Sequence, residues 1–172
     1  MRGATRARMS TMTVLVWMSS TKSLHVVIGA HANSPPADAE WKRYLGTIEA
    51  TLTSHPEATR GLTFTDGAVP SILQRGALNR ILSGRNIPVA VVSESTLVRT
   101  VITALGWFNA DIRAFEPTEL FRACEHLGVS TSDRRSFLVE LSRLSAVWPH
   151  THALRKAVEF ATRPPMTTPA ES

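Results

Sequence analysis

The chain alternates between short runs rich in β-branched residues and longer runs with apolar residues at helical spacing. The short runs predict strands at 13–18, 24–28, 61–65, 87–92 and 111–115. The longer runs predict helices at 35–52, 69–82, 96–108 and 117–127. Strands that alternate with helices are typical of parallel β-sheets, and the polar segment 19–23 suits an antiparallel hairpin. The order β-β-α-β-α-β-α-β-α therefore predicts an α/β fold with a mixed, mostly parallel sheet and helices packed on it.

Helical spacing also predicts which side chains of the second and third helices face the core. In the helix at 69–82 these include Ile72 and Leu73, and in the helix at 96–108 they include Leu97 and Val101. Ser95 is the expected N-cap of the third helix.

After Gly128 the pattern changes to two amphipathic helices. Apolar residues from Phe137 to Trp148 recur at helical spacing, and a second short helix follows from His152 to Ala161. Three roles stay open for this extension: docking on the core, forming a homodimer, or gripping a protein partner. We expect a disordered leader at 1–12, an α/β domain at 13–128, C-terminal helices at 129–163 and a disordered tail at 164–172.

Composition fits one globular domain. Of the 172 residues 43% are hydrophobic and 19% charged, so the chain can bury a core. No apolar run approaches the roughly 20 residues that span a membrane, and the apolar run after Arg2, Arg6 and Arg8 is too short for a signal peptide. The lone Cys124 cannot form an internal disulfide or a cysteine metal cluster. A cytoplasmic protein is the expected result.

The charge balance is basic, with a formal net charge of +5. Such a balance favours nucleic acid or an acidic membrane surface. The arginines, however, are scattered along the chain, and at 6% aromatic residues no stacking platform interleaves with them. Together these features argue against a nucleic-acid partner.

Several stretches resemble a known group of bacterial domains. They are Leu62-Thr-Phe-Thr-Asp-Gly67, Gln74-Arg75, Pro88-Val-Ala-Val-Val92, Val98-Arg99, Ala104-Leu-Gly-Trp-Phe-Asn109 and Arg113-Ala-Phe115. With the element order they are similar to the STAS-like group, which is related to the anti-sigma-factor antagonists and grouped with the Sec14-type lipid-binding fold. The resemblance covers residues 13–128 and is strongest to small uncharacterised proteins of GC-rich bacteria. It implies a non-enzymatic regulatory module that acts through protein–protein contacts.

One departure from that group concerns its phosphorylation switch. Anti-sigma-factor antagonists place a phosphorylatable serine where the third strand meets the next helix. This chain has Thr65-Asp66-Gly67-Ala68-Val69-Pro70-Ser71 there, without the serine motif. The resemblance therefore does not carry a phosphoserine switch to this chain.

Ligands of open α/β sheets bind at the carboxyl ends of the strands, where helix N-termini also point. Two polar clusters are predicted to arrive there, Thr65-Asp66-Gly67 and Ser93-Glu94-Ser95. Arg75 and Arg99 lie in the helices that follow. Arginines beside a carboxylate and hydroxyls make an anion or partner-docking site, and the alternative is that Asp66 and Ser95 only cap helices.

The aromatic residues at helix ends offer a second kind of site. Trp41, Trp107 and Phe108 either cover the core or line a pocket for a small anionic or lipid-like ligand, which is the alternative function. No nucleophile elbow, phosphate loop or dinucleotide-binding turn is present in the sequence, and His150 and His152 lack a third metal ligand. We therefore expect no enzyme activity, no cofactor and no metal.

Overall fold

The structure is a computed structural model that describes residues 10–82, 84–105 and 111–163. Its sheet has five strands in the spatial order β1-β2-β3-β4-β5. Their bounds are β1 Met12–Met18, β2 His25–His31, β3 Thr59–Thr65, β4 Val89–Val92 and β5 Ile112–Phe115. The β1–β2 pair is antiparallel and the other three pairs are parallel, which confirms the predicted mixed, mostly parallel sheet.

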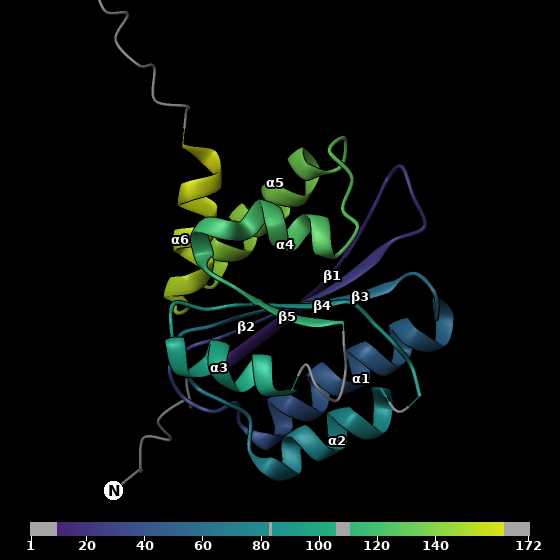
Figure 1. Cartoon of the computed structure of the whole chain (residues 1–172), viewed down its shortest axis with the longest axis vertical. Coiled ribbons are helices and arrows are strands. Elements are labelled where there is room, and N and C mark those ends of the chain that lie inside the picture. Colours follow the sequence, from purple (N-terminus) through teal and green to yellow (C-terminus); the bar gives the residue numbers. More distant parts are fainter. Residues whose placement is uncertain (1–9, 83, 106–110, 164–172) are drawn as a thin grey trace, which may run out of the picture.

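Helices cover both faces of this sheet, as Figure 1 shows. One layer consists of α1 Asp38–Ser54, α2 Ile72–Leu82 and α3 Thr96–Leu105. The other consists of the 3-10 turn η1 Pro117–Glu119, α4 Leu120–His126, α5 Arg134–Val147 and α6 His152–Thr162. The α/β class, the element order and the C-terminal helical extension are confirmed. Among the described residues no helix is long and apolar enough to cross a membrane.

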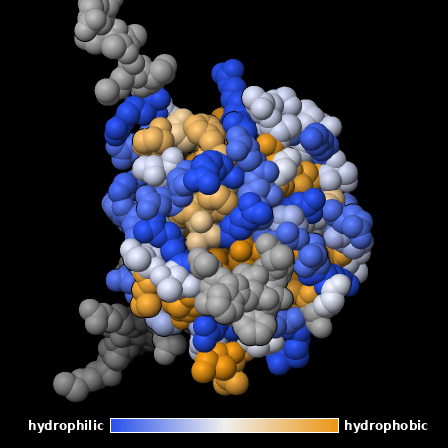
Figure 2. Space-filling model, viewed as in Figure 1, coloured by the Kyte–Doolittle hydropathy of each residue, from blue (hydrophilic) through white to orange (hydrophobic). Residues whose placement is uncertain are grey.

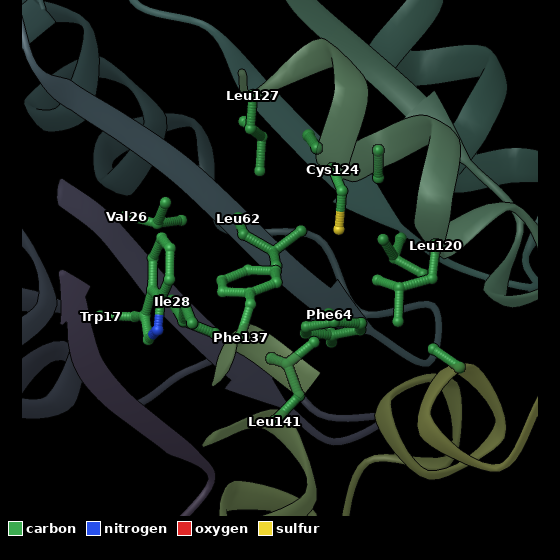
Figure 3. Close-up of a cluster of buried hydrophobic side chains, with 14 of the residues drawn as sticks. Trp17, Val26, Ile28, Leu62, Phe64, Leu120, Cys124, Leu127, Phe137 and Leu141 are labelled. Atoms are coloured by element: carbon green, nitrogen blue, oxygen red, sulfur yellow. The ribbon is translucent and has the colours of Figure 1, made fainter. Parts of the chain in front are cut away.

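The larger core lies between the sheet and the α4–α6 layer (Figure 3). Strand residues two apart, such as Leu62 and Phe64, point to this side and are fully buried. Phe137 of α5 packs edge-on against Trp17 of β1, with 4.8 Å between ring centroids. Leu154 of α6 belongs to the same cluster. The C-terminal helices therefore use their apolar faces for docking on the sheet.

A smaller core lies under α1 on the opposite face. It is built mainly from the side chains that the spacing of this helix predicts to be buried: Trp41, Tyr44, Leu45, Ile48 and Leu52. Val27 of β2 and Ile87 meet them from the sheet side. Helix α2 adds partly buried side chains to this core, namely Ala77, Leu78, Ile81 and Leu82.

The predicted inner faces of α2 and α3 are partly wrong. Ile72 is 78% exposed, Leu73 85% and Leu97 68%, while Val98 is buried. The residue of α2 that is buried is Gln74, whose amide donates to the carbonyl of Pro36 and to Asp38. This polar anchor ties the start of α2 to α1, and farther along α2 the side chains of Ala77, Leu78, Ile81 and Leu82 are partly buried against the smaller core.

Candidate functional site

A cavity of about 810 Å³ lies between the sheet and the α1–α3 layer. The side chains of β3 explain it. Leu62 and Phe64 fill the core on the other face, and the alternate positions on this face are Thr59, Gly61, Thr63 and Thr65. Small side chains at these positions leave space unfilled between the sheet and the helices that cover it.

The walls of the cavity are mostly apolar. They are formed by side chains of β4, β5, α2 and α3, namely Val89, Val91, Ile112, Leu78, Leu82, Val98, Val101 and Ile102. Concave sites with apolar walls and a few polar groups are the usual binding sites for small molecules. The cavity is therefore the candidate functional site.

A polar group lies where β2 and β3 end. His31 is 2% exposed and its Nδ1 lies 3.3 Å from the Thr65 hydroxyl and 3.4 Å from the Ala32 carbonyl. A carbonyl only accepts, so Nδ1 carries the proton. The Thr65 hydroxyl donates to the Ala68 carbonyl at 3.0 Å. Burial lowers the pKa of His31, which favours the neutral imidazole.

A second polar pair lies farther along the cavity. The Tyr44 hydroxyl is 3.2 Å from the Thr63 hydroxyl, and burial raises the pKa of the Tyr44 phenol. Its ring lies on β2 at Gly29, where an added Cβ would come within 3.0 Å of Tyr44 Cε2. Glycine at this position lets the Tyr44 ring approach the strand closely.

Two of the predicted rim residues line this cavity. They are Thr65 and Arg75, and Arg75 is half-buried. Gly67 forms the turn after β3 with φ of +130°, a backbone conformation that favours glycine. Its backbone N–H lies 3.4 Å from the Thr65 hydroxyl.

The acidic rim residues face the other layer. The Asp66 carboxylate accepts from the backbone N–H groups of His152 and Ala153, both at 2.7 Å, and so caps α6. Glu94 accepts from His152 Nδ1 at 2.7 Å and pairs with Lys156. The two predicted clusters thus meet at one sheet edge, but their carboxylates contact the chain's own C-terminal helix.

The remaining rim residues have local partners. Buried Ser93 accepts from the backbone N–H of Ser95, whose own hydroxyl accepts from the Val98 N–H at 3.3 Å and caps α3. Arg99 forms an ion pair with Glu116. Capping is therefore observed for both Asp66 and Ser95.

Of the three aromatic residues predicted to line a pocket, the structure describes one. Trp41 is buried, lines the cavity and donates from Nε1 to the Gln74 carbonyl at 3.0 Å. Trp107 and Phe108 lie outside the described residues.

His31, Tyr44 and Thr63 line the cavity, and no motif in the sequence identified them as site residues. One signal is present. The segment 59–65 forms an interior strand, with β2 and β4 on either side, but it alternates bulky apolar residues with threonine and glycine. A small polar stripe on an interior strand indicates either a close packing partner or a cavity.

The other chemically active side chains lie outside the cavity. Cys124 is buried in the larger core, and burial raises the pKa of its thiol to about 12. His126 Nε2 lies 2.9 Å from the Asp111 carbonyl. Within the described ranges no group of three histidine, cysteine or acidic side chains is arranged to hold a metal.

The surface above the cavity carries exposed apolar side chains. In Figure 2 apolar surface protrudes at the lower edge, over the N-terminal end of α2. Ile72 and Leu73 begin this helix and are largely exposed.

Comparison with protein families finds no family that matches this chain, and comparison with curated proteins finds no match. Among solved structures, the chain is similar to an uncharacterized protein from the DUF3478 family with a SpoIIAA-like fold from Shewanella loihica PV-4. The identity is 13%, the TM-score is 0.48, and the match covers 65% of this chain and 91% of that one.

Proposed function

We propose that this chain is a non-enzymatic binding module whose cavity takes a small apolar molecule. The cavity between β3, β4, α2 and α3 is the observation that carries the proposal. Its volume of about 810 Å³ falls in the range of roughly 300–1,000 Å³ typical of ligand sites. Apolar walls give affinity, and the His31–Thr65 and Tyr44–Thr63 pairs supply polar groups that orient a ligand.

Binding without catalysis fits the hydrogen bonds in the cavity. The one hydroxyl beside an imidazole there, among the described residues, is that of Thr65, and it donates to the Ala68 carbonyl rather than to His31. A nucleophile needs a base that accepts its proton, and His31 Nδ1 carries a proton itself. The pair is arranged to fix the end of β3 and not to activate a nucleophile.

Binding of an uncharged fluorescent apolar probe, N-phenyl-1-naphthylamine, tests the proposal. We expect saturable binding to the full chain and at least about tenfold weaker binding to Val91→Phe, whose ring fills the cavity. Val16→Phe is the matched control, because Val16 is 37% exposed on β1 and does not line the cavity. Equal binding to both variants, or no binding to the folded chain, would contradict the proposal.

A regulatory protein contact is the second candidate function. The exposed side chains of Ile72 and Leu73 at the start of α2 favour it, as does the exposed Leu97 at the start of α3. Exposed apolar residues that gather at one place are typical of interaction sites. Such a partner would contact the rim of the cavity and respond to its occupancy.

Site-specific photo-crosslinking tests the second candidate. A photoreactive residue at position 73 should give one discrete adduct in cells, and the same residue at position 147 should not. Val147 is similarly exposed, at 78%, but lies on α5. Adducts of equal pattern at both positions would exclude a specific contact at the rim.

The homodimer predicted through the C-terminal helices stays a prediction. Their inner faces are buried in the core, so a dimer would use the outer face of α5, where Val139 and Val147 are exposed. Native mass spectrometry of the wild-type chain and of Val147→Lys measures this assembly directly, and the same spectrum detects a retained ligand.

A further inference from the structure

The charged groups that line the cavity are all of one sign among the described residues. Arg60, Arg75 and Arg85 line it, and no aspartate or glutamate does. This inference rests on the proposed function, because a charge preference has meaning only if the cavity holds a ligand. A cavity with cationic groups and apolar walls favours an anionic amphiphile over a neutral or cationic one.

The nearby carboxylates are directed elsewhere. Asp66 caps α6 and Glu94 pairs with Lys156 of the same helix, on the opposite side of the sheet. Glu116 pairs with Arg99, and Asp38 accepts from the Gln74 amide. Each of these four carboxylates therefore has a hydrogen-bonding or ion-pair partner other than Arg75.

Arg75 is the cation best placed to meet a ligand. It is half-buried in α2 and makes no side-chain hydrogen bond or ion pair with any residue that the structure describes. Partial burial of a guanidinium without a hydrogen-bonding partner costs free energy. Charge-assisted hydrogen bonds to a bound carboxylate would offset this cost. The N-termini of α2 and α3 lie at the same edge and add positive potential.

The other two arginines are less suited to this role. Arg60 lies at the opposite end of β3, and its Nη1 donates to the carbonyls of Glu57 and Thr59. Arg85 is exposed to water. Between the two ends, the cavity follows β3 from Thr59 to Thr65, a length of about 20 Å at roughly 3.3 Å per residue.

We propose that the cavity selects a single-chain amphiphile with an acidic head group, a fatty-acid-like carboxylate. The head binds the Arg75 guanidinium beside Thr65, and the acyl chain runs along Val91, Val101 and Ile102. One guanidinium matches one carboxylate in charge and in planar geometry. The length of the cavity along β3, between the sheet and the helices α2 and α3, suits one extended acyl chain.

A ligand series of equal chain length tests the head group. We use dodecanoate, dodecanol, dodecyl phosphate and dodecyltrimethylammonium below their micelle concentrations, and measure displacement of the uncharged probe from the full chain. Dodecanoate should bind at least about tenfold more tightly than dodecanol, and the ammonium compound most weakly. Arg75→Gln should remove this preference, so that dodecanoate binds no more tightly than dodecanol. Arg80→Gln is the matched control, because Arg80 is exposed on the same helix and does not line the cavity.

The outcomes separate this inference from the proposed function. Equal affinity for dodecanoate and dodecanol would overturn the anionic preference while the cavity remains a binding site. Tighter binding of dodecyl phosphate, lost in Arg75→Gln, would support the acidic head at Arg75 and overturn the carboxylate assignment. A loss of dodecanoate binding in Arg85→Gln rather than Arg75→Gln would overturn the position of the head. Failure of every compound, including the probe, with a folded chain would overturn both proposals.

Discussion

The Asp66 carboxylate accepts a hydrogen bond of 2.7 Å from the backbone N–H of His152, a residue 86 positions later in the chain. Its other oxygen accepts from the next backbone N–H, that of Ala153. A side chain at the end of β3 therefore caps the last helix of the fold, although capping residues usually precede their helix. This contact fixes the C-terminal extension to the edge of the sheet where the parallel strands end.

Replacing Asp66 with alanine should destabilise the chain by about 1 kcal/mol, the usual cost of a lost helix cap. The loss should concentrate at the start of α6. Urea unfolding measures the free energy, and hydrogen exchange at residues 152 and 153 locates the change. Glu57→Ala, a loop substitution remote from α6, serves as the control. Unchanged exchange at these two amides would contradict the capping role.

Asp133 joins the β1–β2 hairpin to the start of α5. It is 1% exposed and accepts hydrogen bonds from the hydroxyls of Thr21 at 2.6 Å, Ser130 at 2.7 Å and Ser19 at 2.8 Å. These donors lower its pKa from 3.8 to about 2. Between these values the unfolded chain binds more protons than the folded chain, so stability should fall as pH falls from 3.8 through 2. Carbon-detected NMR titration reads the pKa directly, and Asp133→Asn should abolish this component of the acid unfolding curve.

His31 and His25 should destabilise the fold in mild acid. Burial lowers the pKa of both below 6.5, and stacking of His25 on His55 at 3.7 Å adds repulsion between the two rings once they are charged. The unfolded chain then takes up protons first as pH falls below 6.5. Stability should be complete above 6.5 and decline below it. Urea unfolding at a series of pH values checks this.

Two variants identify the histidines in that experiment. His31→Gln and His25→Gln should each flatten the decline below pH 6.5, whatever they do to stability at pH 8. His150→Gln is the comparison, because His150 is exposed. This substitution should leave the decline below pH 6.5 in place. A decline that persists unaltered in the first two variants would assign it to other groups.

Cys124 should be unreactive while the chain is folded. It is 1% exposed, and burial raises the pKa of its thiol from 9.0 to about 12, so almost no thiolate forms at neutral pH. Labelling with an aromatic disulfide reagent should proceed only at the rate of opening of the core, and denaturant should make it immediate. Rapid labelling of the native chain would show that the core around α4 opens locally.

The helices and strands could be predicted from the sequence because apolar residues recur along them at a regular spacing. The spacing from Trp41 to Leu52 alone identifies the buried face of α1, and Phe137 to Trp148 does the same for α5. The alternation of strands and helices was sufficient to predict the mixed sheet.

Tertiary structure decided which side chains of α2 and α3 are buried. Sequence spacing predicted Ile72 and Leu73 to face inward, but the buried amide of Gln74 ties the start of α2 to α1 and both side chains are exposed. Leu97, at the start of α3, is exposed as well. Periodicity predicts which residues share a face, and Ala77, Leu78, Ile81 and Leu82 of α2 do pack partly buried against the smaller core. Which residues of the first turn stay exposed depends on contacts between α1 and α2, which no pattern within α2 encodes.

The candidate site shows the same division. Sequence order placed Thr65 and Asp66 near Glu94, because β3 and β4 are parallel neighbours, and it placed Arg75 in the helix that follows β3. Which face each side chain uses was settled only by folding: α6 takes the two carboxylates, and the cavity keeps Thr65 and Arg75. The order of residues along the chain determines which side chains reach this edge of the sheet. The docking of α6 determines which of them remain available, because hydrogen bonds and an ion pair with α6 occupy the carboxylates of Asp66 and Glu94.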